Sequence, residues 1–199
     1  MATRSTCTLL ALLALPAAVA AQHGGAAAAP PATTAPAEAS QFDFLIGQWE
    51  LVVRPEARGL AARIHGAGRL VGTWKAWRAL DGWGVEDELR IVDGSGNPLA
   101  LSHTVRVFDA TARHWSLSSL DVYRGRFTTA SAEWRDGRMQ LTGRGTDQEG
   151  RPYLSRTRFF DITRDGFRMQ QDRSLDDGKT WTEAVLRIDA KRVAASAPR

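Results

Sequence analysis

Short turn motifs rich in aspartate and glycine divide the chain between residues 41 and 190 into stretches that alternate apolar and polar residues. The clearest of these turns lie at 93–98, 109–112, 136–137, 147–150, 165–166 and 176–178. Asp-Gly pairs accept the positive φ that tight hairpins require, so they join antiparallel neighbours rather than parallel strands connected by helices. This region is therefore predicted to be all-β.

The stretches between the turns predict about ten strands, because their side chains alternate with a period of two. The expected ranges are 46–53, 64–77, 83–92, 99–108, 113–121, 124–134, 138–146, 152–162, 167–174 and 180–189. No stretch of the region has the sustained apolar stripe of a capped helix. A single helical turn is expected at Gln41–Ile46, with Ser40 as its N-cap.

A meander of this many strands, buried on one face, leaves unpaired edges unless the sheet closes on itself. We therefore expect an up-and-down antiparallel meander closed into a barrel, with the N-terminal helical turn plugging one end. A β-sandwich is the alternative, because periodicity does not exclude Greek-key connections.

Two motifs mark the start and the end of this region. A Phe-Asp-Phe-x-x-Gly-x-Trp motif begins at Phe42; its Gly47 lets the backbone turn into the first strand, and Trp49 can bond a loop carbonyl through its indole N–H. An Asp-Gly-Lys-Thr-Trp hairpin begins at Asp177. Together they resemble calycin-like, lipocalin-shaped barrels, and more closely an exported bacterial family of that shape with no established activity. The resemblance implies the fold and supplies no catalytic residues.

The segment from Ser174 to Trp181 also fits the S-x-D-x-G-x-T-W pattern of the Asp-box hairpins of sialidase-type propellers. In such a turn aspartate side chains accept backbone N–H groups, Gly178 takes a positive φ, and Trp181 packs beneath the hairpin. A propeller needs several copies and a longer chain. The single copy therefore predicts a structural turn rather than a glycosidase.

The N-terminal residues have the composition of an export signal. Arg4 supplies a positive charge, residues 9–15 are apolar, and Ala18-Val19-Ala20 offers a cleavage pattern of small residues. We expect a signal peptide over 1–21, a disordered Ala/Pro-rich linker over 22–40, one barrel domain over 41–190 and a flexible tail over 191–199. The mature protein would then be periplasmic or secreted and would lack Cys7, the one cysteine of the chain.

Charge and hydropathy exclude two classes of partner. The chain carries 26 lysines and arginines against 22 acids, a formal net charge of +4. Arginines are spread along the domain and interrupted by acids, whereas a nucleic-acid binder gathers its basic residues on one strip. Apart from the leader, no stretch reaches the ~18 apolar residues of a spanning helix. We therefore expect no nucleic-acid partner and no membrane span; the sequence does not say whether the chain has protein partners.

Four residues are predicted to line the barrel interior: Trp74, Trp83, His103 and Trp115. His103 shares a period-two face with apolar residues such as Leu101 and Val105, so it is expected to point inward. It is either a buried imidazole bonded to a neighbouring strand or a polar group inside a ligand cavity. Asp87 likewise lies on a mainly apolar face.

Arg156 and Arg158 are candidates for holding an anionic head group. Both alternate with hydrophobic residues, and the planar guanidinium pairs with a carboxylate through two hydrogen bonds. In the alternative register Tyr153, Ser155 and their period-two partners form the inner face, and both arginines are solvated. The sequence does not distinguish the two registers.

Cofactor and enzyme motifs are sparse. No histidine or cysteine pair has metal-site spacing, and the chain lacks a G-x-S-x-G elbow and a phosphate-binding glycine loop. Haem-binding barrels of the nitrobindin kind share the Gly-x-Trp opening, but no histidine follows His114, which leaves His103 as the one substitute ligand. We therefore predict no cofactor.

Three functions remain open. The leading hypothesis is an exported barrel that binds a small hydrophobic or amphipathic ligand, of lipid or fatty-acid type, in its interior. The second is a small barrel enzyme, such as an isomerase, cyclase or hydrolase, that acts on an apolar substrate through His103 and Asp87. The third is a filled barrel that serves as a structural or interaction module of the cell envelope.

Overall fold

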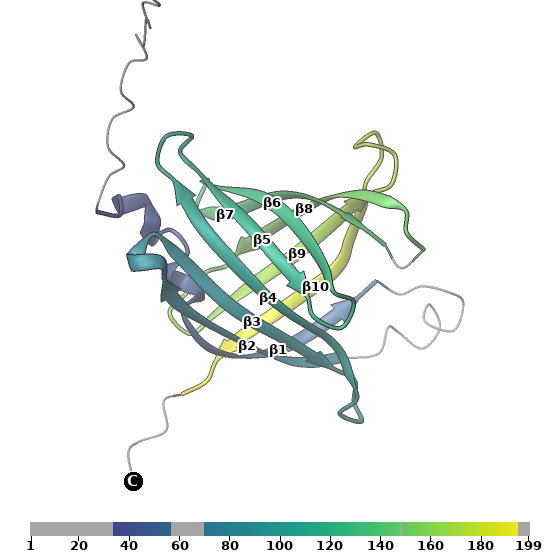
Figure 1. Ribbon diagram of the computed structural model, residues 1–199. Coiled ribbons are helices and arrows are strands. Elements are labelled where there is room, and N and C mark those ends of the chain that lie inside the picture. The colour runs from purple at the N-terminus through teal and green to yellow at the C-terminus, as the bar shows by residue number, and fades with distance from the viewer. Residues whose placement is uncertain (1–33, 57–69, 148, 195–199) are drawn as a thin grey trace, which may run out of the picture. The chain divides into compact units, whose positions relative to one another are not determined.

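The computed structural model describes residues 34–56, 70–147 and 149–194. Within these ranges the chain forms ten β-strands and three short 3-10 helices (Figure 1). In chain order the elements are η1 (Ala37–Ser40), η2 (Asp43–Leu45), β1 (Gly47–Pro55), β2 (Leu70–Ala79), η3 (Leu80–Gly82), β3 (Gly84–Val92), β4 (Pro98–Asp109), β5 (His114–Asp121), β6 (Arg126–Arg135), β7 (Arg138–Thr146), β8 (Pro152–Phe160), β9 (Gly166–Ser174) and β10 (Thr182–Arg192).

The strands form a closed barrel. Each strand pairs antiparallel with its neighbours in sequence, and β1 pairs with both β2 and β10, so that Trp49 lies opposite Trp74 on one side and Arg192 on the other. The predicted all-β, up-and-down barrel is thereby confirmed and the β-sandwich alternative is wrong. The predicted strand ranges agree with the observed ones to within a few residues, except that 64–69 lies outside the described residues.

The turns explain this connectivity locally. At the β6–β7 hairpin Asp136 and Gly137 both have positive φ, 50° and 72°, and Arg135 pairs directly with Arg138. Two consecutive residues with positive φ give the turn a twist that matches the twist of paired strands. The hairpin is therefore as tight as its Asp-Gly pair predicts.

One end of the barrel is closed by the N-terminal turn. Phe42 and Leu45 are fully buried, and the Phe42 ring packs edge-on against Trp115 with centroids 4.8 Å apart. Trp49 is 1% exposed and donates its Nε1–H to the carbonyl oxygen of Leu45 at 2.7 Å. The predicted bond from this indole to a loop carbonyl is present, and it ties η2 to the first strand.

Arg192, at the end of β10, joins the closed end to the seam between the first and last strands. Its guanidinium lies 4.0 Å from the centroid of the Trp49 ring and donates to the carbonyl oxygen of Ile46 at 2.8 Å. Gly47, with a φ of 129°, leaves the space for it, because a Cβ there would lie 2.2 Å from the Arg192 Nη1. The φ of 129°, which residues other than glycine rarely adopt, therefore favours glycine at position 47 and leaves room for Arg192.

Both ends of the domain extend beyond the predicted boundaries. Residues 37–40, which the composition assigned to the linker, form η1 and bury Ala39. Ser40 does not cap the following turn; its hydroxyl donates to Ala37 at 2.6 Å. The strand β10 runs to Arg192, into the predicted tail. The predicted signal peptide and the linker up to residue 33 lie outside the described residues.

The hairpin between β9 and β10 has the hydrogen bonds expected of its aspartate-rich motif. Ser174 accepts the backbone N–H of Gly178 at 2.8 Å, and Asp176 accepts the backbone N–H of Thr180 at 2.9 Å and its hydroxyl at 2.6 Å. Gly178 has a φ of 89°. These bonds, the side-chain bond from Thr180 first, lower the pKa of Asp176 to about 2.

Replacing Trp49 by phenylalanine tests the closed end. Trp49→Phe keeps an aromatic ring but leaves the buried carbonyl of Leu45 without its donor, so we expect a loss of about 2 kcal/mol in the free energy of unfolding. Urea unfolding measures the loss. Trp134→Phe is the control, because Trp134 is 38% exposed. Equal losses for the two variants would contradict the role given to the Trp49 bond.

The ionised form of Asp176 is predicted to stabilise the hairpin. Its pKa is about 2 in the folded protein against an ordinary value of 3.8, so the stabilisation is complete above pH 4 and is lost as pH falls through 2. Asp176→Asn should therefore melt below the wild type at pH 7, by a margin that shrinks toward pH 2. Asp177→Asn, at the neighbouring position, should show no such trend. A margin independent of pH would exclude the mechanism.

Candidate binding cavity

A cavity of about 220 Å³ lies inside the barrel, beyond the aromatic plug of the closed end. One part of its lining is apolar, and its main side chains are Trp74, Leu89, Leu117, Leu141, Phe159, Met169 and Leu186. The other part carries hydroxyl and amide groups from Ser102, Thr104, Ser119, Thr128, Tyr153, Ser155, Thr157 and Gln171. The lining is amphipathic, with an apolar part and a polar part.

The polar residues are partly ordered by bonds between strands. The Thr104 hydroxyl donates to Ser119 at 3.0 Å, and the Gln171 amide donates to Thr157 at 3.3 Å. Each bond joins adjacent strands on the inner face. A hydroxyl that donates to one neighbour keeps acceptor capacity for another. The polar lining can therefore hydrogen-bond a guest molecule without losing these bonds.

A buried ion pair between Asp87 on β3 and Arg106 on β4 borders the cavity. Their side chains are 1% and 4% exposed. Asp87 lies opposite Thr104, so Arg106 is its diagonal neighbour on the same face of the sheet. Burial lowers the pKa of Arg106 to about 9, which still leaves it protonated at neutral pH. The pair thus places two charges, but no net charge, beside the cavity.

Three polar side chains of the lining have buried atoms that make no hydrogen bond in the described structure. They are the Nε1–H of Trp74, the Nε–H of Arg106 and the Oδ1 of Asp87. Trp74 is 4% exposed, and no bulk solvent reaches these atoms. Buried donors and acceptors are almost always satisfied, so these atoms mark desolvated polar groups packed within the barrel wall beside the cavity rather than groups open to it.

The predicted tryptophans fall in three different places. Trp74 lines the cavity, as predicted. Trp115 is fully buried at the closed end, where it packs on Phe42 and Phe108 and donates to the Gln41 side chain at 3.1 Å, so it belongs to the plug. Trp83, between η3 and β3, is half-buried and does not border the cavity.

The inward placement of His103 was wrong. The inner face of β4 carries Thr104 and Arg106, and His103 points to the outer face, where its side chain is 39% exposed and 3.4 Å from Glu86. The prediction failed because the polar groups of this strand face the cavity while leucine and valine face out. Since Asp87 is correctly placed inside, the two residues lie on opposite faces of the barrel wall and do not form an acid–base pair.

Arg156 and Arg158 also lie on the outer face, so the alternative register is the correct one. Both flank Asp172, at 3.4 Å and 3.6 Å, and the Arg156 guanidinium lies 3.9 Å from the Trp181 ring centroid. Burial opposes ionisation of Asp172, but hydrogen bonds from Ala184 and other groups, together with the two arginines, hold its pKa below the ordinary value. These arginines support the aspartate-rich hairpin rather than the cavity.

The hydroxyl-rich lining was largely missed at the sequence level. A signal was present in β4, where the period-two set Ser102, Thr104 and Arg106 ends in the buried Phe108. A polar set on one face normally indicates solvent. In β4 the polar face instead points into the barrel, whose interior is not filled by apolar side chains. The strand pairing in the structure shows that this face points inward, whereas the sequence pattern does not.

Comparisons with protein-family models and with curated proteins gave no match for this chain. Over the described ranges, no three His, Cys, Asp or Glu side chains are grouped so as to hold a metal ion. No helix among the same residues is long and apolar enough to cross a membrane.

The ion pair predicts strongly non-additive substitutions. Asp87→Leu leaves a buried arginine without its counterion, so we expect a loss of about 3–5 kcal/mol in the free energy of unfolding, and a similar loss for Arg106→Met. The double variant Asp87→Leu/Arg106→Met should lose less than the sum of the two, because neither charge then remains. Urea unfolding of all four proteins measures the coupling. Additive losses would contradict a direct pair.

Proposed function

We propose that the barrel binds a small amphipathic molecule in its interior. The observation that carries this proposal is the cavity itself, whose lining combines apolar side chains with hydroxyl and amide groups. An apolar wall with a few polar groups at fixed positions is the usual composition of a small-molecule site. The cavity also favours a binding function over that of a filled structural barrel.

The size of the cavity limits the ligand. About 220 Å³ is below the ~300–1,000 Å³ of pockets that enclose drug-sized molecules. The interior therefore suits a short apolar chain or a small ring rather than a full-length fatty acid. The polar wall and the ion pair favour a molecule that also carries hydrogen-bonding groups.

The site of action follows from the N-terminal signal. We propose that the chain is exported and acts in the periplasm or outside the cell, supported by the leader pattern of residues 1–21. Those residues lie outside the described ranges, and export stays a prediction. So does membership of the calycin-like family that the two sequence motifs resemble.

Filling the cavity tests the proposal. Ala130 on β6 lines the interior and the adjacent Ser131 is exposed on the outer face, so Ala130→Phe and Ser131→Phe place the same ring on opposite sides of one strand. With 1-octanol as the probe, calorimetric titration should show binding to the wild type and to Ser131→Phe. Ala130→Phe should bind at least about tenfold more weakly, because its ring occupies the site.

Ala130→Leu replaces the phenylalanine variant if thermal unfolding shows that the larger ring is not accommodated. The proposal fails if the wild type does not bind 1-octanol. It also fails if the folded cavity-filling variant binds as tightly as the wild type.

A further inference from the structure

A second hollow, of about 470 Å³, lies at the barrel end opposite the helical plug. It is bordered by the β5–β6 and β7–β8 turns and by the end of β9, at residues such as Arg124, Asp147 and Arg173. Thr128 and Tyr153 line both this hollow and the inner cavity. The two spaces therefore adjoin, and a molecule in the cavity can extend to the mouth.

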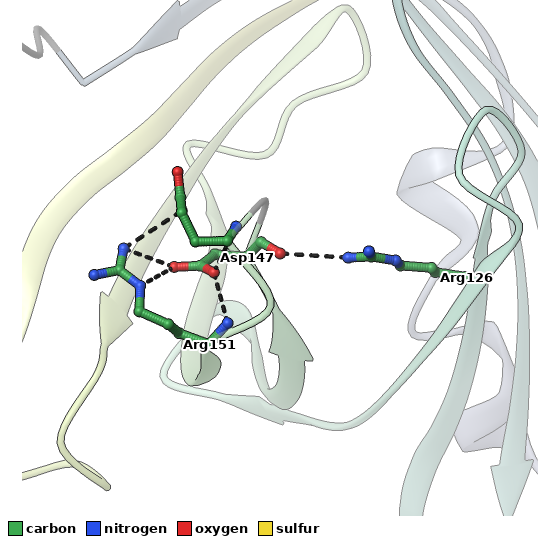
Figure 2. Close-up of polar contacts among 4 residues, drawn as sticks. Arg126, Asp147 and Arg151 are labelled. Atoms are coloured by element: carbon green, nitrogen blue, oxygen red, sulfur yellow. Dashed lines mark hydrogen bonds and ion pairs between the residues drawn. The ribbon is translucent and has the colours of Figure 1, made fainter.

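Most charges around the mouth are paired locally. Arg124 contacts the Asp121 carboxylate at 2.8 Å. Arg151 contacts the Asp147 carboxylate at 2.8 Å (Figure 2). It also lies 3.5 Å from the Glu149 carboxylate. Two arginines thus pair with these three carboxylates, each within its own turn. Glu56 also lines the hollow and has an interaction partner of its own.

Arg126 and Arg173 differ from the other arginines of the mouth. Arg126 donates to the backbone carbonyl of Asp147 at 3.3 Å, and not to its carboxylate (Figure 2). The Arg173 guanidinium lies 4.1 Å from the Tyr153 ring centroid; its Nε is buried, so its two Nη groups, for which the described residues supply no hydrogen bond, are the donors that an anion can reach. Among the residues that the structure describes, neither has an ion-pair partner. Two guanidinium groups at the mouth thus keep N–H donors for an anion.

The position of Arg173 is fixed without using these donors. At Gly145 on β7 a Cβ would lie 2.6 Å from the Tyr153 hydroxyl oxygen, so the absence of a side chain there lets the ring lie against the strand. Arg173 then stacks on this ring, and stacking leaves the planar N–H groups of a guanidinium available. The geometry holds a bidentate donor ready at the entrance.

We infer that the ligand of the barrel carries an anionic head group, a carboxylate or a phosphate monoester, held at the mouth by Arg126 and Arg173 while its apolar part occupies the cavity. This inference rests on the proposed function. The inner Asp87–Arg106 pair is neutral as a whole and does not attract a second anion. The charge selectivity therefore resides at the mouth.

A series of probes with the same eight-carbon chain tests the head group. Calorimetry with octanoate, octyl phosphate, 1-octanol and octylammonium should show one or both anions binding about tenfold tighter than 1-octanol, since a charge-assisted hydrogen bond contributes about that factor. Octylammonium should bind more weakly than 1-octanol. The stronger of the two anions identifies the head group.

Substitutions of Arg126 and Arg173 test whether these two residues cause the preference for an anion. Arg173→Gln and Arg126→Gln should weaken binding of the preferred anion until its affinity approaches that of 1-octanol. The affinity for 1-octanol itself should not fall. Arg138→Gln removes one exposed charge at the opposite end of the barrel and should change neither. Arg173→Lys keeps the charge but loses the planar fork, and it should retain part of the preference.

The outcomes separate the two proposals. If 1-octanol binds as tightly as both anions, the inference is overturned while the proposed function stands. The same conclusion follows if Arg173→Gln and Arg126→Gln keep the full preference for the anion and thermal unfolding shows that both variants are folded. If no probe binds the wild type, the proposed function fails with it.

Discussion

The pairing of β1 with β10 is the constraint on which the rest of the structure depends. Closure leaves no unpaired strand edge and turns one face of every strand into an interior. The seam is held by Arg192, which stacks on Trp49 and bonds the backbone at Ile46. Since Trp49 also bonds Leu45, one indole connects the first strand, the last strand and the plug.

The plug determines where the barrel can hold a molecule. Aromatic rings from the N-terminal turn and from β5, β8 and β9 fill the closed end, with Phe42 against Trp115 and Phe44 against Phe167. Beyond them the lining combines apolar side chains with hydroxyl groups, among them those of Thr104, Ser119 and Thr157. The cavity thus begins where the aromatic side chains end, and its polar wall continues to a mouth with two arginines that lack acidic partners among the described residues.

The sequence predicted the fold well and the site poorly, for one physical reason. Turn chemistry is local: Asp136-Gly137 specifies a tight hairpin wherever it occurs, so the meander could be derived residue by residue. When both faces of a strand carry polar and apolar residues, the neighbouring residues in the sequence do not decide which face points inward. Leu101 and Val105 suggested that His103 faces the interior, yet the interior side carries Thr104 and Arg106.

The sequence by itself determined an all-β chain, the plug with its tryptophan bond and the aspartate-rich hairpin, because each depends on neighbouring residues. It favoured closure over a sandwich, because closure covers the strand edges, and the pairing of β1 with β10 decided between them. Only the tertiary structure decided that Arg106 and Asp87 meet inside, that Arg156 and Arg158 flank Asp172 outside, and that Arg173 stacks at the mouth. Those contacts join different strands, and their partners follow from register and from the direction of each side chain, which period-two alternation leaves ambiguous.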